Sequence, residues 1–175
     1  MSHLLEVKNL DVKFDTDEGR ITAVENISLS VDQGQVLGIV GESGSGKSVT
    51  AKSIMKLNPG NTTYNEDAEI ILDNENVLQF TSKQDLKKIR GGKVSMIFQE
   101  PMASFAPAIK IGAQMVEQLL IHKKINKDEA KSISINMLKR VGIADAEKRF
   151  NQYAFELSGG MRQRAMIAMA LSTMP

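Results

Sequence analysis

The chain has 175 residues, 42% of them hydrophobic and 25% charged, which suits one soluble domain with a core, or one domain with an added lobe. The formal net charge of +1 argues against a strong overall field that would gather nucleic acid or anionic lipid. Cysteine is absent, so disulfides are excluded, and two distant histidines do not predict a metal site. No membrane-length apolar run or signal-peptide core is present, which predicts a cytosolic protein.

The first 35 residues alternate apolar and polar side chains, as antiparallel strands do. Leu10, Val12 and Phe14 lie on one face of the first of these strands. The predicted elements are a strand over residues 4–14, a turn over 15–19, and strands over 21–24 and 26–31.

A phosphate-binding pattern, G-x-x-x-x-G-K-[ST], follows a strand that we predict over residues 34–40. A helix predicted over residues 48–57 comes after it, with Ala51, Ile54 and Met55 on one face. The residues of the pattern are Gly41, Glu42, Ser43, Gly44, Ser45, Gly46, Lys47 and Ser48. A flexible Gly/Ser linker is the alternative, and the flanking strand and helix argue against it.

The residue types in this loop suit a nucleotide's phosphates. Gly44 and Gly46 lack a Cβ, so the backbone can curl and aim successive N–H groups inward. The following helix directs its positive N-terminal end to the same place. Lys47 adds a full positive charge, and Ser48 offers a hydroxyl to Mg²⁺.

Three short elements are predicted between this loop and residue 99. They are a strand over residues 69–73 after a polar loop at 61–68, a charged helix over 82–90, and a buried strand with Val94, Met96, Ile97 and Phe98. The last strand ends in Gln99. Because ligands bind at the carboxyl ends of strands in open α/β sheets, Gln99 is expected to point where Lys47 points.

Residues 100–156 read as helices without strands. One helix is predicted over residues 111–121, and the next begins at an Asn126 N-cap with Glu129 three residues later and ends at Gly142. The chain's ten methionines lie mostly in such helices. They indicate either pliable core packing or a mobile partner-binding surface.

A second glycine motif begins at Leu157. Ser158 can cap the helix that follows, and Gly159 and Gly160 would let a phosphate approach its N-terminus. One ATP could bridge the two motifs if they came from different subunits, or if the helical segment 100–156 folded over the first motif.

Taken together, residues 41–48, Gln99 and residues 157–164 resemble the Walker A, Q-loop and signature motifs of ABC transporter nucleotide-binding subunits. The resemblance covers the whole chain and is most specific for the oligopeptide/dipeptide importer ATPases, through residues 38–48, 89–92 and 158–164. Nickel importers share much of this pattern, so the cargo stays open.

The resemblance implies an α/β fold: an incomplete P-loop NTPase (RecA-like) core sheet with an N-terminal antiparallel β subdomain and an inserted α-helical subdomain. It implies an ATP-binding core with the β subdomain over residues 1–99 and a helical, permease-facing subdomain over 100–156. Residues 157–175 would carry the signature motif and begin the return to the core.

The resemblance also implies ATP and Mg²⁺ as cofactors. Lys47 and Gln99 become the catalytic candidates, Ser48 and Gln99 the Mg²⁺ ligands, and Phe14 a residue that stacks on adenine or simply belongs to the core. Ser158 and Gly160 would contact the γ-phosphate held by the other subunit. The implied nucleotide-binding residues are Phe14, Gly41, Glu42, Ser43, Gly44, Ser45, Gly46, Lys47, Ser48, Val49, Gln99, Ser158, Gly159 and Gly160.

The implied partners are a second ABC ATPase subunit, identical or not, and integral-membrane permease subunits, with no direct nucleic acid contact. The protein would sit peripherally on the cytoplasmic face of the cell membrane. ATP hydrolysis would then power the import of di- or oligopeptides.

One departure from the family pattern concerns the general base. The family places an apolar strand ending in Asp-Glu after the signature helix, whereas the sequence here ends at Pro175. The resemblance therefore predicts an N-terminal fragment that binds nucleotide weakly and hydrolyses little. A smaller departure is the segment 103–107, where relatives usually carry Leu-Asn-Pro.

Three other functions remain as alternatives. A soluble ABC-type ATPase acting on nucleic acid or ribosomes is disfavoured by the near-neutral charge. A P-loop kinase leaves Gln99 and residues 157–164 unexplained. A non-catalytic structural or interaction module is the third.

Overall fold

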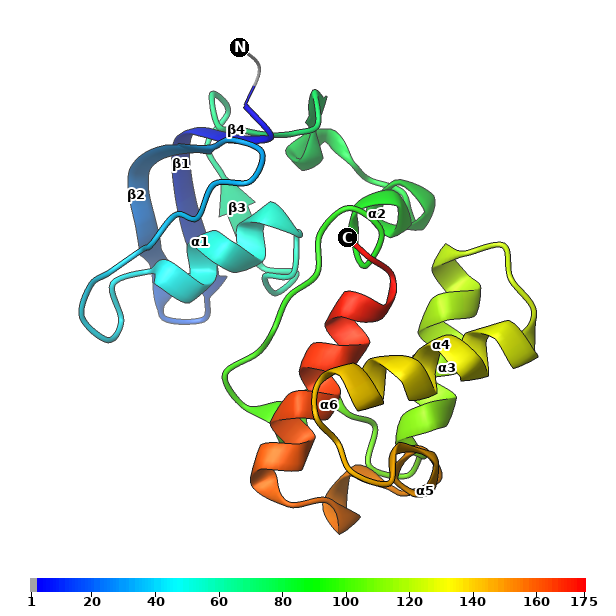
Figure 1. Ribbon diagram of the computed structural model, residues 1–175. Helices are drawn as coiled ribbons and strands as arrows, with labels where there is room; N and C mark the ends of the chain where they lie inside the picture. The colour runs from blue at the N-terminus through cyan, green and yellow to red at the C-terminus, as the bar shows by residue number, and fades with distance from the viewer. Residues whose placement is uncertain (1–2) are drawn as a thin grey trace. The chain divides into compact units, whose positions relative to one another are not determined.

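The computed structural model describes residues 3–175, except for the side chain of Ala103. The chain divides into two compact units, one ending at Leu86 and one spanning Lys87–Pro175. Figure 1 shows a sheet with helix α1 in the first unit and helices α3 to α6 in the second. The functional division predicted at residues 99 and 156 stays a prediction.

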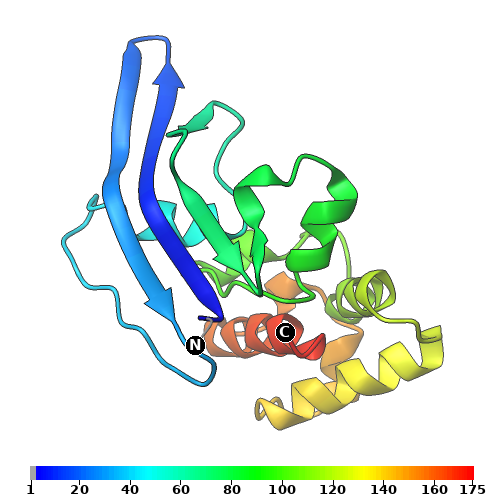
Figure 2. The same cartoon turned by 90° about the horizontal axis from the view of Figure 1, so that it is seen from above.

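The first unit is built on a five-stranded antiparallel sheet in the order β2-β1-β4-β5, with β3 also paired to β1. Its strands are β1 Leu5–Thr16, β2 Gly19–Val31, β3 Thr62–Tyr64, β4 Glu69–Leu72 and β5 Glu75–Asn76. β1 and β2 form the long hairpin that Figure 2 shows side by side. Val7, Leu10, Val12 and Ile70 are almost fully buried in this unit's core.

The hairpin corrects two of the predicted boundaries. Residues 21–24 and 26–31 form one strand, β2, rather than two, and pairing extends through Thr16 and Gly19, so the predicted turn is shorter. The break expected near residue 25 is instead an irregularity in the register. Asn26 adopts a left-handed φ of 47° there, and its N–H donates to Asp11 Oδ1 at 2.6 Å. A side-chain acceptor replaces the lost ladder bond, so the strand continues.

The polar segment predicted as a loop over residues 61–68 also contributes a strand, β3. Thr62, Thr63 and Tyr64 pair with residues 12–14 of β1. Polar β-branched and aromatic residues satisfy an edge position because one face meets water. The strand predicted over 69–73 is confirmed as β4.

The two buried strands predicted to flank the nucleotide motifs are absent from the described chain. Residues 35–40 form no strand, and Val36 and Val40 are 94% and 93% exposed. Around residue 96 only Val94 makes an isolated bridge, with Arg90, while Ile97 is 52% exposed. Apolar runs of this kind become strands only when neighbouring strands satisfy their backbone and cover both faces. No described strand does so, and the parallel core sheet is therefore not observed.

The helices follow the predicted pattern more closely. They are α1 Lys47–Ile54, α2 Lys83–Ile89, α3 Ile111–His122, α4 Lys127–Arg140, α5 Ala146–Phe150 and α6 Gly159–Ser172, with 3₁₀ turns η1 Val77–Gln79, η2 Pro101–Ser104 and η3 Ala154–Glu156. Asn126 caps α4 in a full capping box with Glu129, as predicted. Gly142 follows the helix with φ of 77°, which confirms its predicted end. The face predicted from Ala51, Ile54 and Met55 is partly wrong, because only Met55, the C-cap, is buried. The buried residues within α1 are Thr50 and Ser53.

The second unit has a core in which α3, α4 and α6 meet. Met115, Met137 and Met166 belong to this core, so the packing interpretation of the methionines is confirmed for these three. Ala165 and Ala168 are fully buried on α6 and give its neighbours close access. The helix that begins with the second glycine motif is thus anchored in the helical core.

Candidate nucleotide-binding site

The loop over residues 41–48 is curled in the way its glycines permit. Gly44 and Gly46 have φ of 84° and 85°, which side chains with a Cβ rarely adopt. The loop is also closed at its start, because a Cβ on Gly41 would lie 2.7 Å from Ser45 Oγ. The loop therefore curls at Gly44 and Gly46, as predicted, while the close approach of Gly41 to Ser45 was not predicted.

Lys47 lies at the centre of this curl. Its ammonium donates to the carbonyl oxygens of Gly41 at 2.8 Å and Glu42 at 2.6 Å, and to Ser45 Oγ at 3.2 Å. The N–H of Ser45 donates to the Glu42 carbonyl at 3.3 Å. The loop is therefore wrapped around a positive charge that is held by loop oxygens.

Helix α1 starts at this lysine without a side-chain cap. Gly46 is the N-cap, no side chain accepts from the first turn, and no acidic residue lies in that turn. The first N–H groups and the positive end of the helix dipole therefore remain available to an anion. Thr50 strengthens the turn, with its N–H and its hydroxyl donating to the Gly46 carbonyl at 2.8 and 3.0 Å.

Strand β2 packs against the loop at Gly46, a contact that was not predicted from the sequence. A Cβ on Gly46 would lie 2.5 Å from the carbonyl oxygen of Ala23 and 3.0 Å from Val24 Cγ2. The β subdomain therefore touches the loop at its most constrained glycine. Nothing in the local pattern of residues 21–24 signals this, because the contact depends on how α1 packs.

The far end of α1 is held by a polar cluster. The Asn58 amide donates to Ser53 Oγ at 2.8 Å and to the Tyr64 hydroxyl at 3.3 Å, which ties the helix to β3. Ser53 is fully buried and also donates to the Val49 carbonyl at 2.9 Å. The helix that presents the loop is thereby fixed to the sheet at both ends.

The other predicted nucleotide contacts in this unit differ in exposure. The Ser48 residue is exposed, whereas Val49 is half-buried and would act through its backbone. Phe14 is half-buried on β1, opposite Ile21 and Thr62. A half-buried ring fits both the adenine-stacking and the core interpretation, so its role stays a prediction.

The described residues contain no cluster of three or more His, Asp or Glu side chains that could hold a metal ion. The predicted Mg²⁺ ligands, Ser48 and Gln99, are both exposed. One hydroxyl and one amide oxygen suit Mg²⁺, which keeps several waters and takes most other ligands from phosphates. The residues therefore fit a metal that arrives with the nucleotide.

The second glycine motif lies at the N-terminus of α6. Ser158 is the N-cap, and its hydroxyl accepts from the Met161 N–H at 3.3 Å, as predicted. Gly159 and Gly160 are exposed, and a Cβ on either would meet no atom within 4 Å. The helix start is open to a ligand or partner from outside.

Two contacts join α6 to the turn just after Gln99. Arg162 donates to Met102 Sδ at 2.9 Å, and the Ser104 hydroxyl donates to Met166 Sδ at 3.1 Å. Arg164 also holds the Gly142 carbonyl at 2.8 Å. Sequence reasoning did not pair these residues, since a methionine offers no recognisable acceptor pattern. The η2 turn that follows Gln99 therefore contacts helix α6 directly.

The loop with Lys47 belongs to the first unit, and Gln99 with Ser158 to the second. That Gln99 points toward Lys47 stays a prediction.

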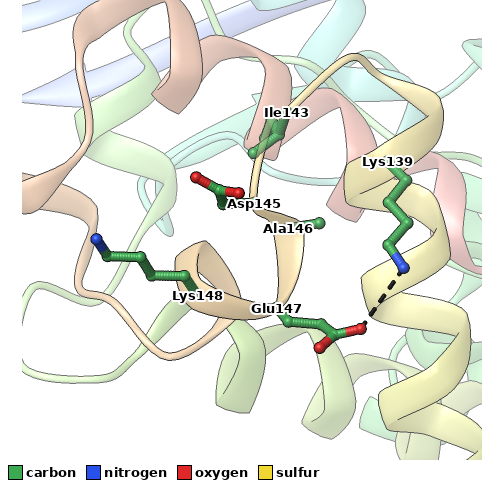
Figure 3. Close-up of a pocket in the computed structure, with 6 residues that line it drawn as sticks. All are labelled: Lys139, Ile143, Asp145, Ala146, Glu147 and Lys148. Atoms are coloured by element: carbon green, nitrogen blue, oxygen red, sulfur yellow. Dashed lines mark ion pairs between the residues drawn. The ribbon is translucent and has the colours of Figure 1, made fainter.

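A separate pocket of about 620 Å³ lies on the second unit. It is lined by Lys139, Ile143, Asp145, Ala146, Glu147 and Lys148, and none of the predicted site residues is among them. Figure 3 shows Lys139 and Glu147 facing each other across an ion pair of 3.6 Å. Both side chains are more than half exposed, so the pocket is a charged surface groove rather than a closed ligand cavity.

Comparison with known proteins places these motifs in a family. Residues 24–175 match the model of the ABC transporter family. The fold is also similar to the dimeric ATP-binding cassette MJ0796, solved in a post-hydrolysis state with ADP and Pi. That match has a TM-score of 0.83 and 26% identity, and covers 98% of this chain and 70% of the other. The chain belongs to the ABC transporter family, with a P-loop NTPase fold.

The curated relatives are more specific. The chain is 45% identical over 175 residues to the oligopeptide transport ATP-binding protein OppD of Bacillus subtilis, and 47% identical over 173 residues to the dipeptide transport ATP-binding protein DppD of Lactococcus lactis. These matches cover 100% and 98% of this chain, and 49% of each relative. The chain therefore spans about half the length of the peptide-transport proteins it matches.

Proposed function

We propose that this chain is the ATP-binding part of an ATPase that drives peptide import, and that residues 41–48 bind the phosphates of ATP. The curled loop is the main support for this proposal. Gly44 and Gly46 have left-handed backbone conformations, and the Lys47 ammonium lies at the centre of the loop. The uncapped N-terminus of α1 opens to the same place. The peptide-transport relatives support the choice of cargo.

The loop residues divide the binding task. Lys47 would replace hydrogen bonds to the Gly41 and Glu42 carbonyls with hydrogen bonds to β- and γ-phosphate oxygens, which are stronger acceptors. The amides of the α1 N-terminus would donate to the same phosphates. Bound Mg²⁺ would neutralise phosphate charge, with the Ser48 hydroxyl and the Gln99 amide as its protein ligands.

The second glycine motif would serve a neighbouring subunit. Ser158 and Gly160 would contact the γ-phosphate bound by a second ATPase subunit, which accounts for their exposure and for the open space around both glycines. The cassette MJ0796, a similar fold, is dimeric. The helical lobe would dock on permease subunits at the cytoplasmic face of the membrane. No described helix has the length and apolar character needed to cross a bilayer.

Nucleotide titration tests the binding site. Labelled ATP with Mg²⁺ is titrated onto the wild type, Lys47→Ala and Lys52→Ala, which removes the same charge from the other end of α1. Loss of a charge-assisted hydrogen bond is worth about 1.5–3 kcal/mol, so Lys47→Ala should weaken binding by roughly 10- to 150-fold. Lys52→Ala should bind as the wild type does. Equal affinity for all three proteins would refute the phosphate site.

Transport is tested separately. The whole protein, reconstituted with its permease, should turn over ATP when peptide is supplied. Normal nucleotide binding without any peptide-dependent turnover would refute peptide import and leave the nucleotide site standing.

A further inference from the structure

Two helices end next to each other within the second unit. Helix α2 ends at Ile89, and α3 ends at His122. The His122 ring packs against Gly91 and Gly92 in the turn that follows α2. A Cβ on Gly91 would lie 2.7 Å from His122 Nε2, and the Gly91 N–H donates to the Val94 carbonyl at 2.7 Å. This contact joins two segments that are about 30 residues apart into one surface.

The joined surface is strongly basic. We call it the basic surface, and its cationic residues are Lys87, Lys88, Arg90, Lys93, Lys123 and Lys124. No Asp or Glu occurs in residues 86–94 or 118–127. Lys88, Arg90 and Lys93 each have an interaction partner within the chain, whereas the structure records no ion pair for Lys87, Lys123 or Lys124 within residues 3–175. Positive charge is thus concentrated here, although the whole chain has a net charge of only +1.

The positive charge on this surface also affects the pKa of His122. Burial lowers the pKa of His122, and the positive charge of Lys87 lowers it further. The other charged groups on the two segments around the ring, those of Lys88, Arg90, Lys93, Lys123 and Lys124, are also cationic. Protonation, which would add a positive charge to the His122 ring, is therefore disfavoured.

Helix dipoles explain only part of this pattern. A helix C-terminus favours a cation within its last turn, which suits Lys87 and Lys88 on α2. Lys93 and Lys124 lie beyond the helix ends. Ile121, one residue before His122, is 44% exposed and adds an apolar side chain to the surface. Clustered lysines with an exposed apolar residue are the composition that binds acidic bilayer surfaces.

We propose that the basic surface binds the anionic headgroups of a membrane leaflet directly. The proposal rests on the proposed function only in that a peptide importer's ATPase works beside a membrane. It adds a lipid contact that needs no permease.

Vesicle binding by the full chain tests the proposal. Co-sedimentation compares phosphatidylcholine vesicles with vesicles that also contain phosphatidylglycerol, and only the latter should bind the wild type. Each lysine near an acidic surface contributes about fivefold in affinity, so the triple variant K87Q/K123Q/K124Q should lose on the order of a hundredfold. The variant K87R/K123R/K124R keeps the charge and should keep the binding.

The matched control removes the same charge elsewhere on the second unit. The variant K110Q/K127Q/K131Q should bind acidic vesicles as the wild type does. Equal losses in both glutamine variants, or binding that ignores headgroup charge, would overturn the proposal. So would tighter binding of a single-stranded oligonucleotide than of acidic vesicles. ATP titration of K87Q/K123Q/K124Q should match the wild type, so failure here and failure of the nucleotide site are distinguishable.

Discussion

The two glycine motifs meet a helix N-terminus in different ways. At α1 the N-cap is Gly46, which has no side chain to cap the helix and contacts the Ala23 carbonyl and Val24 directly. At α6 the N-cap is Ser158, which satisfies the Met161 N–H, and a Cβ on either of the glycines after it would meet no atom within 4 Å. The first motif is constrained by its own chain, whereas the second is not.

This difference separates two reasons for a glycine. Gly46 is required by backbone handedness and by contact with β2, so it matters before any nucleotide arrives. Gly159 and Gly160 have ordinary helical backbone and no neighbour that a Cβ would displace. Any requirement for them must come from outside the chain, which is what the proposed contact with a neighbouring subunit's nucleotide supplies.

The largest effect is expected from Gly46→Ala. A non-glycine residue at φ of 85° costs about 1–3 kcal/mol, and its Cβ would also meet the Ala23 carbonyl at 2.5 Å. Denaturant unfolding should show a loss of at least this size, together with loss of ATP binding. Gly60→Ala is the control, because its Cβ meets nothing within 4 Å. Equal stability of the two variants would mean that the loop is not held by β2.

A smaller effect is expected from Ser158→Ala. The variant loses the acceptor for the Met161 N–H, and such a cap is worth about 1 kcal/mol. Ser158→Asp should retain most of the stability, because Asp caps helices equally well. If both substitutions destabilised equally in denaturant unfolding, the hydroxyl would have a role other than capping.

Gly159→Ala should change stability little, by at most about 0.5–1 kcal/mol and in the favourable direction, because Ala prefers the helix and its Cβ is unopposed. ATP-dependent dimerisation of the whole protein should nonetheless weaken, as measured by analytical ultracentrifugation. Lost stability in the isolated chain would show that the chain itself requires this glycine, and would remove the contrast with Gly46.

The smallest effect concerns pH and His122. Burial and Lys87 lower the pKa of His122 below its usual 6.5 in the folded state, so the unfolded chain binds the proton more readily. Stability should therefore fall as pH decreases through 6.5, until the lower folded pKa is passed. His122→Gln should flatten this part of a stability–pH curve. An unchanged curve would contradict the assignment.

The local elements could be predicted because their signals are local. The cap of α4 by Asn126 and Glu129, the cap of α6 by Ser158 and the curl at Gly44 each depend on residues within a few positions. Hydrogen bonds over three or four residues need no distant partner, so a short sequence window contains all their atoms.

The strand predictions failed where the partners are distant. Residues 35–40 have an apolar run typical of a buried strand, yet Val36 and Val40 are exposed, because no described strand pairs with them. Conversely, β3 formed from a polar segment because β1 offered an open edge. Pairing partners, rather than propensity, decided both outcomes.

The sequence by itself determined the family, the phosphate loop, both ends of α4 and the start of α6, because these depend on residue types at fixed short spacings. Only the tertiary structure decided that β2 touches Gly46, that Arg162 reaches Met102, and that His122 joins two basic segments. Those contacts link residues between 23 and 60 positions apart. Their geometry depends on how whole elements pack, which short-range patterns do not encode.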